Sequence, residues 1–566
     1  MAYFLKQTKQ GDRIYLQISE TTYNNVTKKS SNRVYQKLGY LDALISEEMP
    51  DPIAFYKAKI VKMNKKLEQQ KAEESILKIA EDPTRNIGYF LVKALVNTLK
   101  LSDEMELMNR VHDYNFNMAA FVEALTYSRI VEPCSKLKTY TDIFPYLYEK
   151  YDLSLDQIYS GLDFVGSRYS QFIEILNYRI NKTFSRDTKY TYFDCTNYYF
   201  EIDLEKDDKQ KGPSKENRHD PIIGQALLLD GEGIPLGMKM YAGNKSEKPM
   251  LKKLIDEIKR THNLSGKTVH VADKGLNSGE NIHQTLKDGN GYIYSQSVMQ
   301  LDEKERKWVL SPYDYEDVKD NSGNLLYRIK ACVDNFPIWI NTEDGKKERV
   351  LLKQKRVVTF NPSLAEKKRI EINKQIDKAI NLSHSQAKKE EYGDSSKYVK
   401  FVDSDGNKAD IIINEDKIKK DLELAGYNLL VTSELKMSKR EVYRVYHNLW
   451  KIEDTFRVLK SELDARPVYL QNKERIYGHF LICYYGVTLL RLLETEIFKD
   501  TFNIYDIINL IRNLKILKGK DKNTNLSKAT KNINTLTQKY DFNIDNFYLT
   551  DNDVDKLFKY KYRLKK

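Results

Sequence analysis

The sequence predicts an α/β protein of several domains, and three observations lead to this expectation. The chain has 566 residues, which is more than one hydrophobic core usually organises. Hydrophobic residues make up 41% of it and aromatic residues 11%, a composition typical of folded domains rather than of disorder. Between residues 185 and 290, short apolar segments that fit strands alternate with amphipathic segments that fit helices.

The order of these patterns divides the chain into six stretches. Alternating apolar and polar residues near the N-terminus fit strands, and the next stretch has helical periodicity, as in FNMAAFVEALTYSRI. We predict a small β module over 1–45, a helical region over 46–184, the first part of an α/β core over 185–290, a β-rich insertion over 291–425, the second part of the core over 426–500, and a basic helical tail over 501–566.

Local signals mark element boundaries within the core. Gly231–Gly233, between two apolar stretches, predicts a β-hairpin turn. Asn277 with Glu280, and Ser438 with Glu441, have the three-residue spacing of a capping box. Each pair therefore predicts the start of a helix.

Composition and motif content exclude several classes of protein. The four cysteines form no CxxC pair and the eight histidines lack zinc-ligand spacing, so neither a disulfide framework nor a zinc site is predicted. The absence of GxxxxGK[ST] and GxSxG argues against a P-loop NTPase and an α/β-hydrolase. The net charge of +12 suits a polyanionic partner but is weak evidence alone.

The sequence favours a cytoplasmic location without a membrane anchor. The first residues, MAYFLKQTKQGDRIYLQ, lack the features of a signal peptide. The longest apolar segment, Phe480–Leu490, is too short to cross a bilayer and is followed by Arg491. The scattered cysteines fit a reducing compartment.

A carboxylate stands in the middle of an aromatic segment, YTYFDCTNYYFE, which starts at residue 190. This composition predicts a buried strand, in which Tyr192, Asp194 and Thr196 lie on one face and Cys195 on the other. An ionised carboxylate among aromatic rings is costly to bury unless a partner compensates its charge. Asp194 is therefore a candidate functional residue.

Two further acidic residues have a suggestive local setting. Asp273 ends the predicted strand TVHVA, and ligands of α/β proteins collect at such strand ends. Glu453 lies one residue after Ile452, which begins an apolar helical stripe, so it borders buried surface. Two ordinary explanations stay open: Asp273 as a turn residue, and Glu453 as part of a solvated face paired with Arg457.

Metal-assisted phosphoryl transfer would unite the three carboxylates. Two Mg²⁺ ions can activate an attacking oxygen and stabilise the leaving one. Mg²⁺ prefers hard oxygen ligands, which Asp and Glu supply without Cys or His.

The three carboxylates lie in a series of four characteristic stretches, which are YFDCTNYYFE, GIPLGMKMYAGNKSE, VADKGLNSGENI and YHNLWKIEDTFRVLKSELDARPVY. In this order they resemble the catalytic core of bacterial insertion-sequence transposases of the DDE type, which are relatives of retroviral integrases with a ribonuclease-H-like fold. The resemblance covers about 185–495 and is with the branch that carries a β-rich insertion between the second Asp and the Glu. RIVEPCSK, at 129–136, is also similar to that family.

The resemblance implies roles for individual residues. It identifies Asp194, Asp273 and Glu453 as the catalytic triad, holding two Mg²⁺ or Mn²⁺ ions. It also implies that two residues contact DNA phosphates beside the scissile bond. These are Tyr446 and Lys460.

One position departs from the pattern of this branch. Leu449 stands where the branch has an arginine, four residues before the Glu. Arg457, one turn after Glu453, or Lys274 is a candidate source of the missing positive charge at the phosphate. The departure concerns phosphate contacts and leaves the metal ligands unaffected.

The implied activity is DNA transposition. Transposon ends would be nicked by hydrolysis and the freed 3′-OH ends joined to target DNA, with double-stranded DNA as partner, a homodimer in the complex, and a bacterial, nucleoid-associated location. Two alternatives stay open: a metal-dependent nuclease that cuts without joining, and an inactive DNA-binding derivative.

DNA recognition is less evident from the sequence. The helical region, the basic loop at 206–218, the insertion and the Lys-rich tail are all candidates. Trp450, beside the predicted catalytic helix, is expected in the core rather than stacked on a base.

Overall fold

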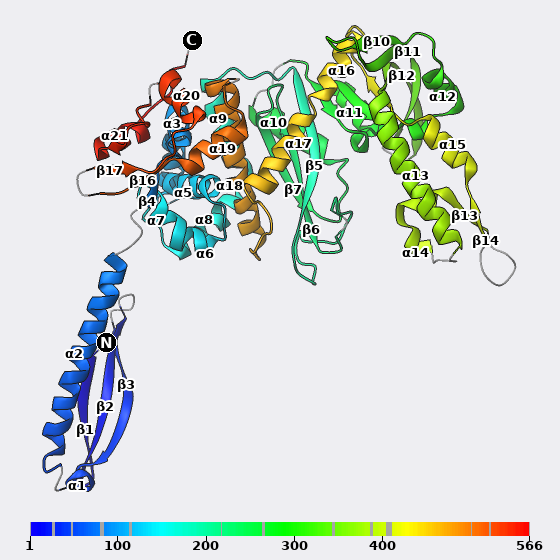
Figure 1. Cartoon of the computed structure of the whole chain (residues 1–566). Helices are drawn as coiled ribbons and strands as arrows, with labels where there is room; N and C mark the ends of the chain where they lie inside the picture. The colour runs from blue at the N-terminus through cyan, green and yellow to red at the C-terminus, as the bar shows by residue number, and fades with distance from the viewer. Residues whose placement is uncertain are drawn as a thin grey trace. The chain divides into compact units, whose positions relative to one another are not determined.

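The computed structural model describes most of the chain. The described residues are 2–24, 29–46, 49–79, 84–112, 116–216, 218–262, 266–341, 346–384, 389–402, 410–499, 501–519, 522–540 and 542–564. They belong to two compact units, Met1–Thr84 and Arg85–Lys566, each described here by itself (Figure 1). The fold is mixed α/β, as predicted.

The first unit is a three-stranded antiparallel sheet with one long helix. Its elements are β1 (Ala2–Gln10), β2 (Arg13–Asn24), β3 (Lys29–Tyr40), α1 (Leu41–Leu44) and α2 (Pro52–Ile79). β2 lies in the centre, and Leu16 and Ile18 on it are fully buried. The Asn64 side chain on α2 exchanges hydrogen bonds of 2.8 and 2.9 Å with the backbone of Tyr3 on β1, which holds the helix along the sheet.

A nine-stranded sheet organises the second unit (Figure 1). In spatial order its strands are β10 (Glu316–Lys319), β11 (Leu325–Asn341), β12 (Lys347–Phe360), β15 (Tyr427–Thr432), β9 (Gly291–Gln296), β8 (Val269–Ala272), β5 (Tyr190–Tyr199), β6 (Ile222–Leu229) and β7 (Pro235–Ala242). β5, β8 and β9 run parallel, and the other neighbours pair antiparallel. The predicted hairpin turn at Gly231–Gly233 joins β6 to β7.

Strand β5 separates two hydrophobic cores, as its alternating sequence predicts. Tyr192 and Tyr198 belong to the larger core, whereas Phe193 and Cys195 belong to the core on the other face. The larger core contains apolar residues of α17 (Trp450–Arg457) and α18 (Lys473–Leu492). The other contains residues of α10 (Met250–His262) and α11 (Gly279–Lys287), so each face of the sheet is covered by helices.

Helices from both ends of this unit build the larger core. They are α3 (Phe90–Leu99), α4 (Leu101–His112), α5 (Met118–Val131), α7 (Phe144–Tyr146), α8 (Leu155–Ser167), α9 (Tyr169–Thr183), η6 (Leu493–Phe498), α19 (Ile504–Asn513), α20 (Lys531–Tyr540) and α21 (Asp551–Phe558). Two short helical turns, α6 (Lys136–Lys138) and η1 (Thr139–Ile143), connect α5 to α7. A small sheet joins them, with β18 (Tyr548–Leu549), β17 (Asn523–Asn525), β16 (Lys515–Leu517) and β4 (Thr84–Asn86) in that order.

The core helix α18 explains the apolar segment near residue 480. Together with η6 it forms a helical stretch, Lys473–Phe498, that is long and apolar enough to cross a membrane. It therefore extends beyond the apolar segment that we judged too short. Its most apolar part is 100% buried inside the protein, as expected for the central helix of a core.

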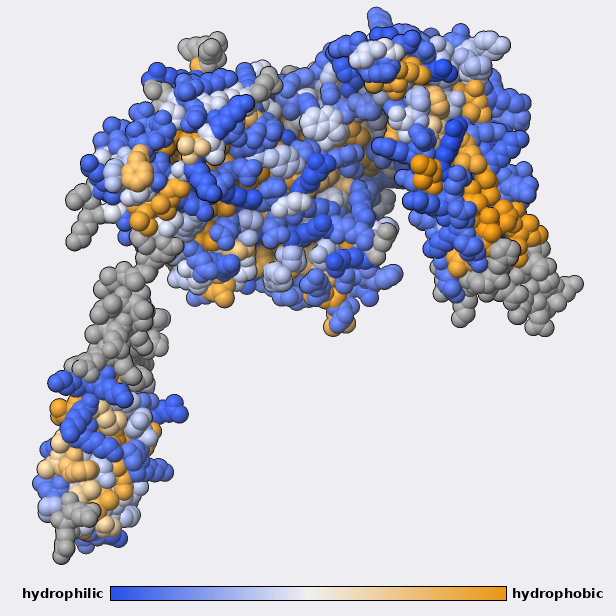
Figure 2. All heavy atoms as spheres, viewed as in Figure 1, coloured by the Kyte–Doolittle hydropathy of each residue, from blue (hydrophilic) through white to orange (hydrophobic). Residues whose placement is uncertain are grey.

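The chain between β9 and β15 builds a lobe with its own small core. Besides β10–β12 it contains η3 (Val298–Gln300), α12 (Glu303–Leu310), α13 (Pro362–His384), α14 (Lys389–Tyr392), η4 (Gly393–Tyr398), β13 (Val399–Val402), β14 (Asp410–Ile413) and α15 (Glu415–Glu423). Ile372, Tyr392 and Tyr398 are buried in this small core. Hydrophobic side chains gather on the visible face of this lobe, whereas most of the visible surface is hydrophilic (Figure 2).

Candidate active site

Two of the three predicted carboxylates lie on neighbouring strands: Asp194 in the middle of β5, and Asp273 directly after the last residue of β8. Phe193 on β5 pairs with Ala272 on β8 in parallel register, so the next residues, Asp194 and Asp273, lie at the same level. Asp273 therefore stands at the carboxyl end of β8, where ligands of α/β proteins collect, whereas Asp194 lies within β5 beside it. The fold therefore brings Asp194 and Asp273 together.

Asp194 is surrounded by charges of both signs. Its Oδ1 accepts a hydrogen bond of 2.7 Å from the backbone N–H of Cys195 and lies 3.6 Å from the Lys215 ammonium, which is also 3.7 Å from Glu247. Burial raises the pKa of Asp194 to about 6, and the carboxylates of Glu247 and Asp273 act in the same direction. Lys215 and the backbone hydrogen bond oppose this rise.

Asp273 is oriented by two hydroxyl groups. Its Oδ1 accepts hydrogen bonds from Ser295 at 2.8 Å and from Tyr446 at 3.3 Å. Burial raises the pKa of Tyr446, and the negative charges of Asp273 and Glu453 contribute. Tyr446 therefore lies within electrostatic reach of both acidic residues and keeps its proton for the bond to Asp273.

Helix α17 presents the third carboxylate. Glu453 is exposed, and its side chain forms no hydrogen bond or ion pair with the described residues. Arg457 instead pairs with Asp454 at 3.3 Å. The alternative explanation, an ion pair between Glu453 and Arg457, is therefore wrong. α17 packs against β5.

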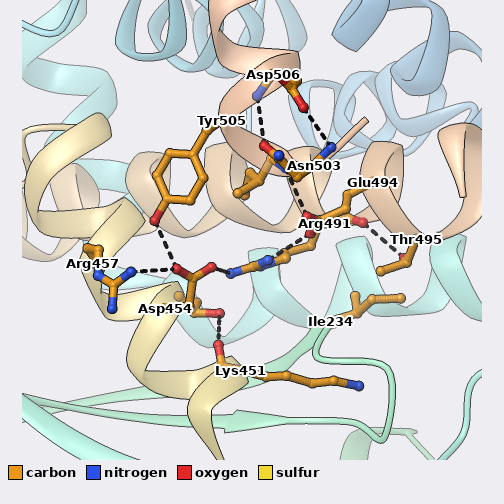
Figure 3. A network of polar contacts seen from close by, with 12 residues as sticks. Ile234, Lys451, Asp454, Arg457, Arg491, Glu494, Thr495, Asn503, Tyr505 and Asp506 are labelled. Atoms are coloured by element: carbon orange, nitrogen blue, oxygen red, sulfur yellow. Dashed lines mark hydrogen bonds and ion pairs between the residues drawn. The ribbon is translucent and has the colours of Figure 1, made fainter. Parts of the chain in front are cut away.

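Buried polar contacts hold α17 in place (Figure 3). The carboxylate of Asp454 accepts bonds of 2.6 Å from Arg491 on α18 and 2.8 Å from Tyr505 on α19, and Arg491 also bonds to Glu494 at 2.7 Å. Asp454 and Arg491 are only 7% and 6% exposed. Because Glu453 is the preceding residue, this network fixes the position of its backbone.

The prediction that Trp450 belongs to the core is wrong. The side chain is 55% exposed, because α17 turns Ile452 and Phe456 inward and its first residue outward. Trp450 lines an open cavity of about 790 Å³, together with Lys451 and residues of η6.

Lys460 lies in a cluster of opposite charges beyond α17. Lys460 belongs to the π-helical turn η5 (Val458–Glu462), which directly follows α17. Its ammonium group lies 3.3 Å from the carboxylate of Glu216, which also pairs with Arg466. Burial lowers the pKa of Lys460. Burial acts to raise the pKa of Glu216, but its pairing with Arg466 and Lys460 leaves that pKa below the ordinary value.

The remaining predicted DNA-contact residues have different settings. Lys274 is exposed at the start of η2 (Lys274–Leu276), next to Asp273. Leu449, at the position of the expected arginine, is 7% exposed and occupies the N-cap position of α17 without a side-chain capping bond. Arg457 points to the carboxylate of Asp454 (Figure 3).

The donor set fits a hard divalent cation, although no closed metal shell is formed. Within the described ranges, no three His, Cys, Asp or Glu side chains come close enough together to hold a metal. Asp194 and Asp273 offer carboxylate oxygens at the same level of two adjacent strands, and the carboxylate of Glu453 has no hydrogen-bond or ion-pair partner among the described residues. The cation that contacts Asp194 is the Lys215 ammonium.

Sequence reasoning missed several residues of this site. Ser295 could have been found from strand pairing: Ala272 on β8 pairs with Tyr294 on β9, so the next residues, Asp273 and Ser295, lie at the same level. Lys215 and Glu216 lie in the predicted basic loop, but no local pattern indicates their partners.

Comparison with known protein families gives a match. A family model described as "Transposase DDE domain" matches residues 196–487, more than half of the chain. The match begins just after Asp194 and includes Asp273 and Glu453. No curated protein matches the chain.

Proposed function

Because the chain belongs to the DDE transposase family, we propose that it binds the ends of an insertion sequence, nicks them by metal-dependent hydrolysis and joins the freed 3′-OH ends to target DNA. The family implies DNA as partner and a nucleotidyl-transfer reaction. The observation that carries the proposal is the position of Asp194 and Asp273 at the same level of two parallel strands, with the Tyr446 hydroxyl group donating to Asp273.

The proposed catalytic core is ribonuclease-H-like. Its support is the strand arrangement β7-β6-β5-β8-β9, three antiparallel strands followed by two parallel ones. The lobe between β9 and β15 separates Asp273 from Glu453 in the sequence and corresponds to the proposed insertion.

Asp194, Asp273 and Glu453 would hold two Mg²⁺ or Mn²⁺ ions, and such ions act as Lewis acids that activate an attacking oxygen and stabilise a leaving oxygen. The hydroxyl groups of Ser295 and Tyr446 keep the Asp273 carboxylate oriented. No Ser or Tyr nucleophile is needed, because both nicking and joining are direct phosphoryl transfers.

Lys460 and Arg466 would contact the DNA phosphates flanking the reacting bond. They now share the carboxylate of Glu216, so a DNA phosphate would take the place of that carboxylate. Lys274, next to Asp273, is a further candidate contact, whereas the pairing of Arg457 with Asp454 directs it elsewhere. Two ends must be joined in one reaction, so we propose a homodimer in the DNA complex, acting at the bacterial nucleoid.

The test is a cleavage and joining assay with a labelled duplex that carries the DNA ends flanking this gene. It compares Mg²⁺ with EDTA, and the wild-type protein with Glu453→Gln and with a matched control, Glu441→Gln, on the preceding helix. We expect metal-dependent cutting and joining that Glu453→Gln loses and Glu441→Gln keeps. Equal cutting by Glu453→Gln would overturn the proposed triad.

A pre-cut end with a free 3′-OH separates transposition from simple nuclease activity. Joining of that end to target DNA supports a transposase, whereas cutting without joining supports a nuclease. Binding without any cutting indicates an inactive derivative.

A further inference from the structure

A small cavity lies outside the proposed active centre. Its volume is about 120 Å³, and it is lined by the loop before α6, by the chain that follows η5 and by α18. Leu137 and Tyr469 at its edge are 54% and 71% exposed, so the cavity reaches the surface. Its wall contains two cationic side chains that no step of the proposed reaction uses. These are Arg129 and Lys136.

Both cations are buried without a counter-ion. Arg129 is 5% and Lys136 6% exposed. Arg129 donates only to backbone carbonyls, at 3.0 Å to Cys134 and 3.5 Å to Asp464. Over the residues that the structure describes, no carboxylate lies within 4.0 Å of either cation; Asp464 lines the cavity but contributes its carbonyl.

A neutral histidine holds the lysine in position. Lys136 Nζ donates to Nδ1 of His479 at 3.3 Å, and Nε2 of His479 donates to the carbonyl of Ala465 at 3.2 Å. Burial, with the charges of Lys136 and Arg129, keeps the pKa of His479 well below its usual value, so the ring carries no charge. His479 therefore orients the ammonium group without compensating it.

This arrangement is unfavourable for the free protein. Burial lowers the pKa of Lys136 to about 7, and the neighbouring Arg129 acts in the same direction. Two like charges out of water are costly unless an anion pairs with them. Because Lys136 and Arg129 are buried at this cost and face an open cavity, we infer that the cavity takes a negatively charged ligand.

We propose that this cavity binds a phosphate group of the DNA backbone, with Arg129 and Lys136 as its ligands. Arginine binds phosphate through a planar pair of N–H donors, and lysine adds a compact charge. Arg466 directly precedes Pro467 of the cavity wall, and it pairs with Glu216 beside Lys460. The same chain segment thus connects the cavity with the cations that would contact DNA in the proposed complex. This inference rests on the proposed function.

The test is a comparison of Lys136→Gln with a matched control, Lys138→Gln, both in the full chain. Lys138 is exposed on the same short helix, and glutamine can still donate a hydrogen bond to His479. We expect Lys136→Gln to bind duplex DNA about tenfold more weakly, since a charge-assisted hydrogen bond is lost. The slope of log K against log salt should fall by about 1.

The unfolding temperature distinguishes binding from a structural role. Without DNA, Lys136→Gln should unfold at the wild-type temperature or above it, because a buried charge without a partner is removed. A lower unfolding temperature together with wild-type affinity and salt slope would make Lys136 a structural residue and overturn the proposal.

Inorganic phosphate tests the cavity independently of transposition. At constant ionic strength, replacing chloride with phosphate should raise the unfolding temperature of the wild type and of Lys138→Gln, but not of Lys136→Gln. If Lys136→Gln loses the phosphate effect but binds DNA with wild-type affinity, the cavity binds free phosphate, and the proposed contact with the DNA backbone is overturned. If the wild type binds no DNA, the proposed function fails, and the phosphate arm still reports on the cavity.

Discussion

The ammonium group of Lys215 lies 3.6 Å from the carboxylate of Asp194. The next residue, Glu216, pairs with Lys460 and Arg466. One short segment thus places a cation against a proposed metal ligand and an anion against the proposed phosphate contacts. The Lys215 ammonium group occupies the place of a metal ion at Asp194, and the Glu216 carboxylate occupies the place of a DNA phosphate at Lys460 and Arg466. A metal ion and a phosphate would therefore compete with these two side chains for the same partners.

Replacing Lys215 should therefore strengthen metal binding to the free protein. Lys215→Gln removes the positive charge beside Asp194, and we expect the Mn²⁺ affinity to rise about threefold, because an ion pair that solvent partly reaches is worth little. Titration calorimetry or Mn²⁺ electron paramagnetic resonance measures this without DNA. Lys211→Gln, an exposed lysine of the same loop, is the control. Equal affinities in wild type and Lys215→Gln would remove Lys215 from the metal site.

Asp194→Asn should abolish cleavage, keep duplex affinity near the wild-type value and change the pH dependence of stability. The raised pKa of about 6 means that the folded protein holds the proton more tightly than the unfolded chain does. The ionisation of Asp194 thus costs stability, and this cost develops as the pH rises from about 4 to 6 and persists above.

In EDTA, Asp194→Asn should therefore unfold at a higher temperature than the wild type at pH 7 to 8. The difference should vanish towards pH 4, where the aspartate is protonated in both states. Asp203→Asn, at an exposed loop position, is the control and should show no such pattern. A stability gain that is equal at every pH would contradict the burial of the Asp194 charge.

Patterns within one element were predictable from the sequence. The alternation in β5 predicts which side chains enter which core, and Ser438 caps α16 (Lys439–His447) by accepting from the N–H of Glu441 at 3.1 Å, as its spacing predicts. The other predicted cap is displaced by one residue. Ser278, not Asn277, caps α11, and the Asn277 side chain instead donates to the Ser295 carbonyl.

Features that depend on distant chain segments were not predictable. The spacing of a regular α-helix does not extend from Glu453 to Lys460, because Lys460 lies in η5, a π-helical turn that is wound more widely than an α-helix. Lys460 then meets Glu216, which is far away in the sequence. Periodicity gives the face of a regular helix, but it contains no information on such partners.

The buried pair Asp454–Arg491 should stabilise the position of the catalytic helix. Asp454→Asn alone leaves Arg491 buried without its main partner, which we expect to cost about 3–5 kcal/mol of unfolding free energy. A double-mutant cycle with Arg491→Gln, measured by urea unfolding, gives the coupling between the two residues. The single variants should also cut DNA more slowly, because α17 carries Glu453. Additive effects of the two changes would show that they do not act as a pair.

Removal of part of the lobe between β12 and β15 should leave the core folded. Asn361 N–H donates to the carbonyl of Gly426 at 3.0 Å, so the chain enters and leaves this part of the lobe at one point. The part between them has its own core around Tyr392 and Tyr398. Replacing residues 362–425 with a short glycine linker should therefore cost little stability, since the central sheet keeps all its strands. We expect wild-type Mn²⁺ binding but impaired processing of DNA ends. A deletion variant that cuts and joins normally would exclude a role of this part in transposition, and one that does not fold would show that it supports the sheet.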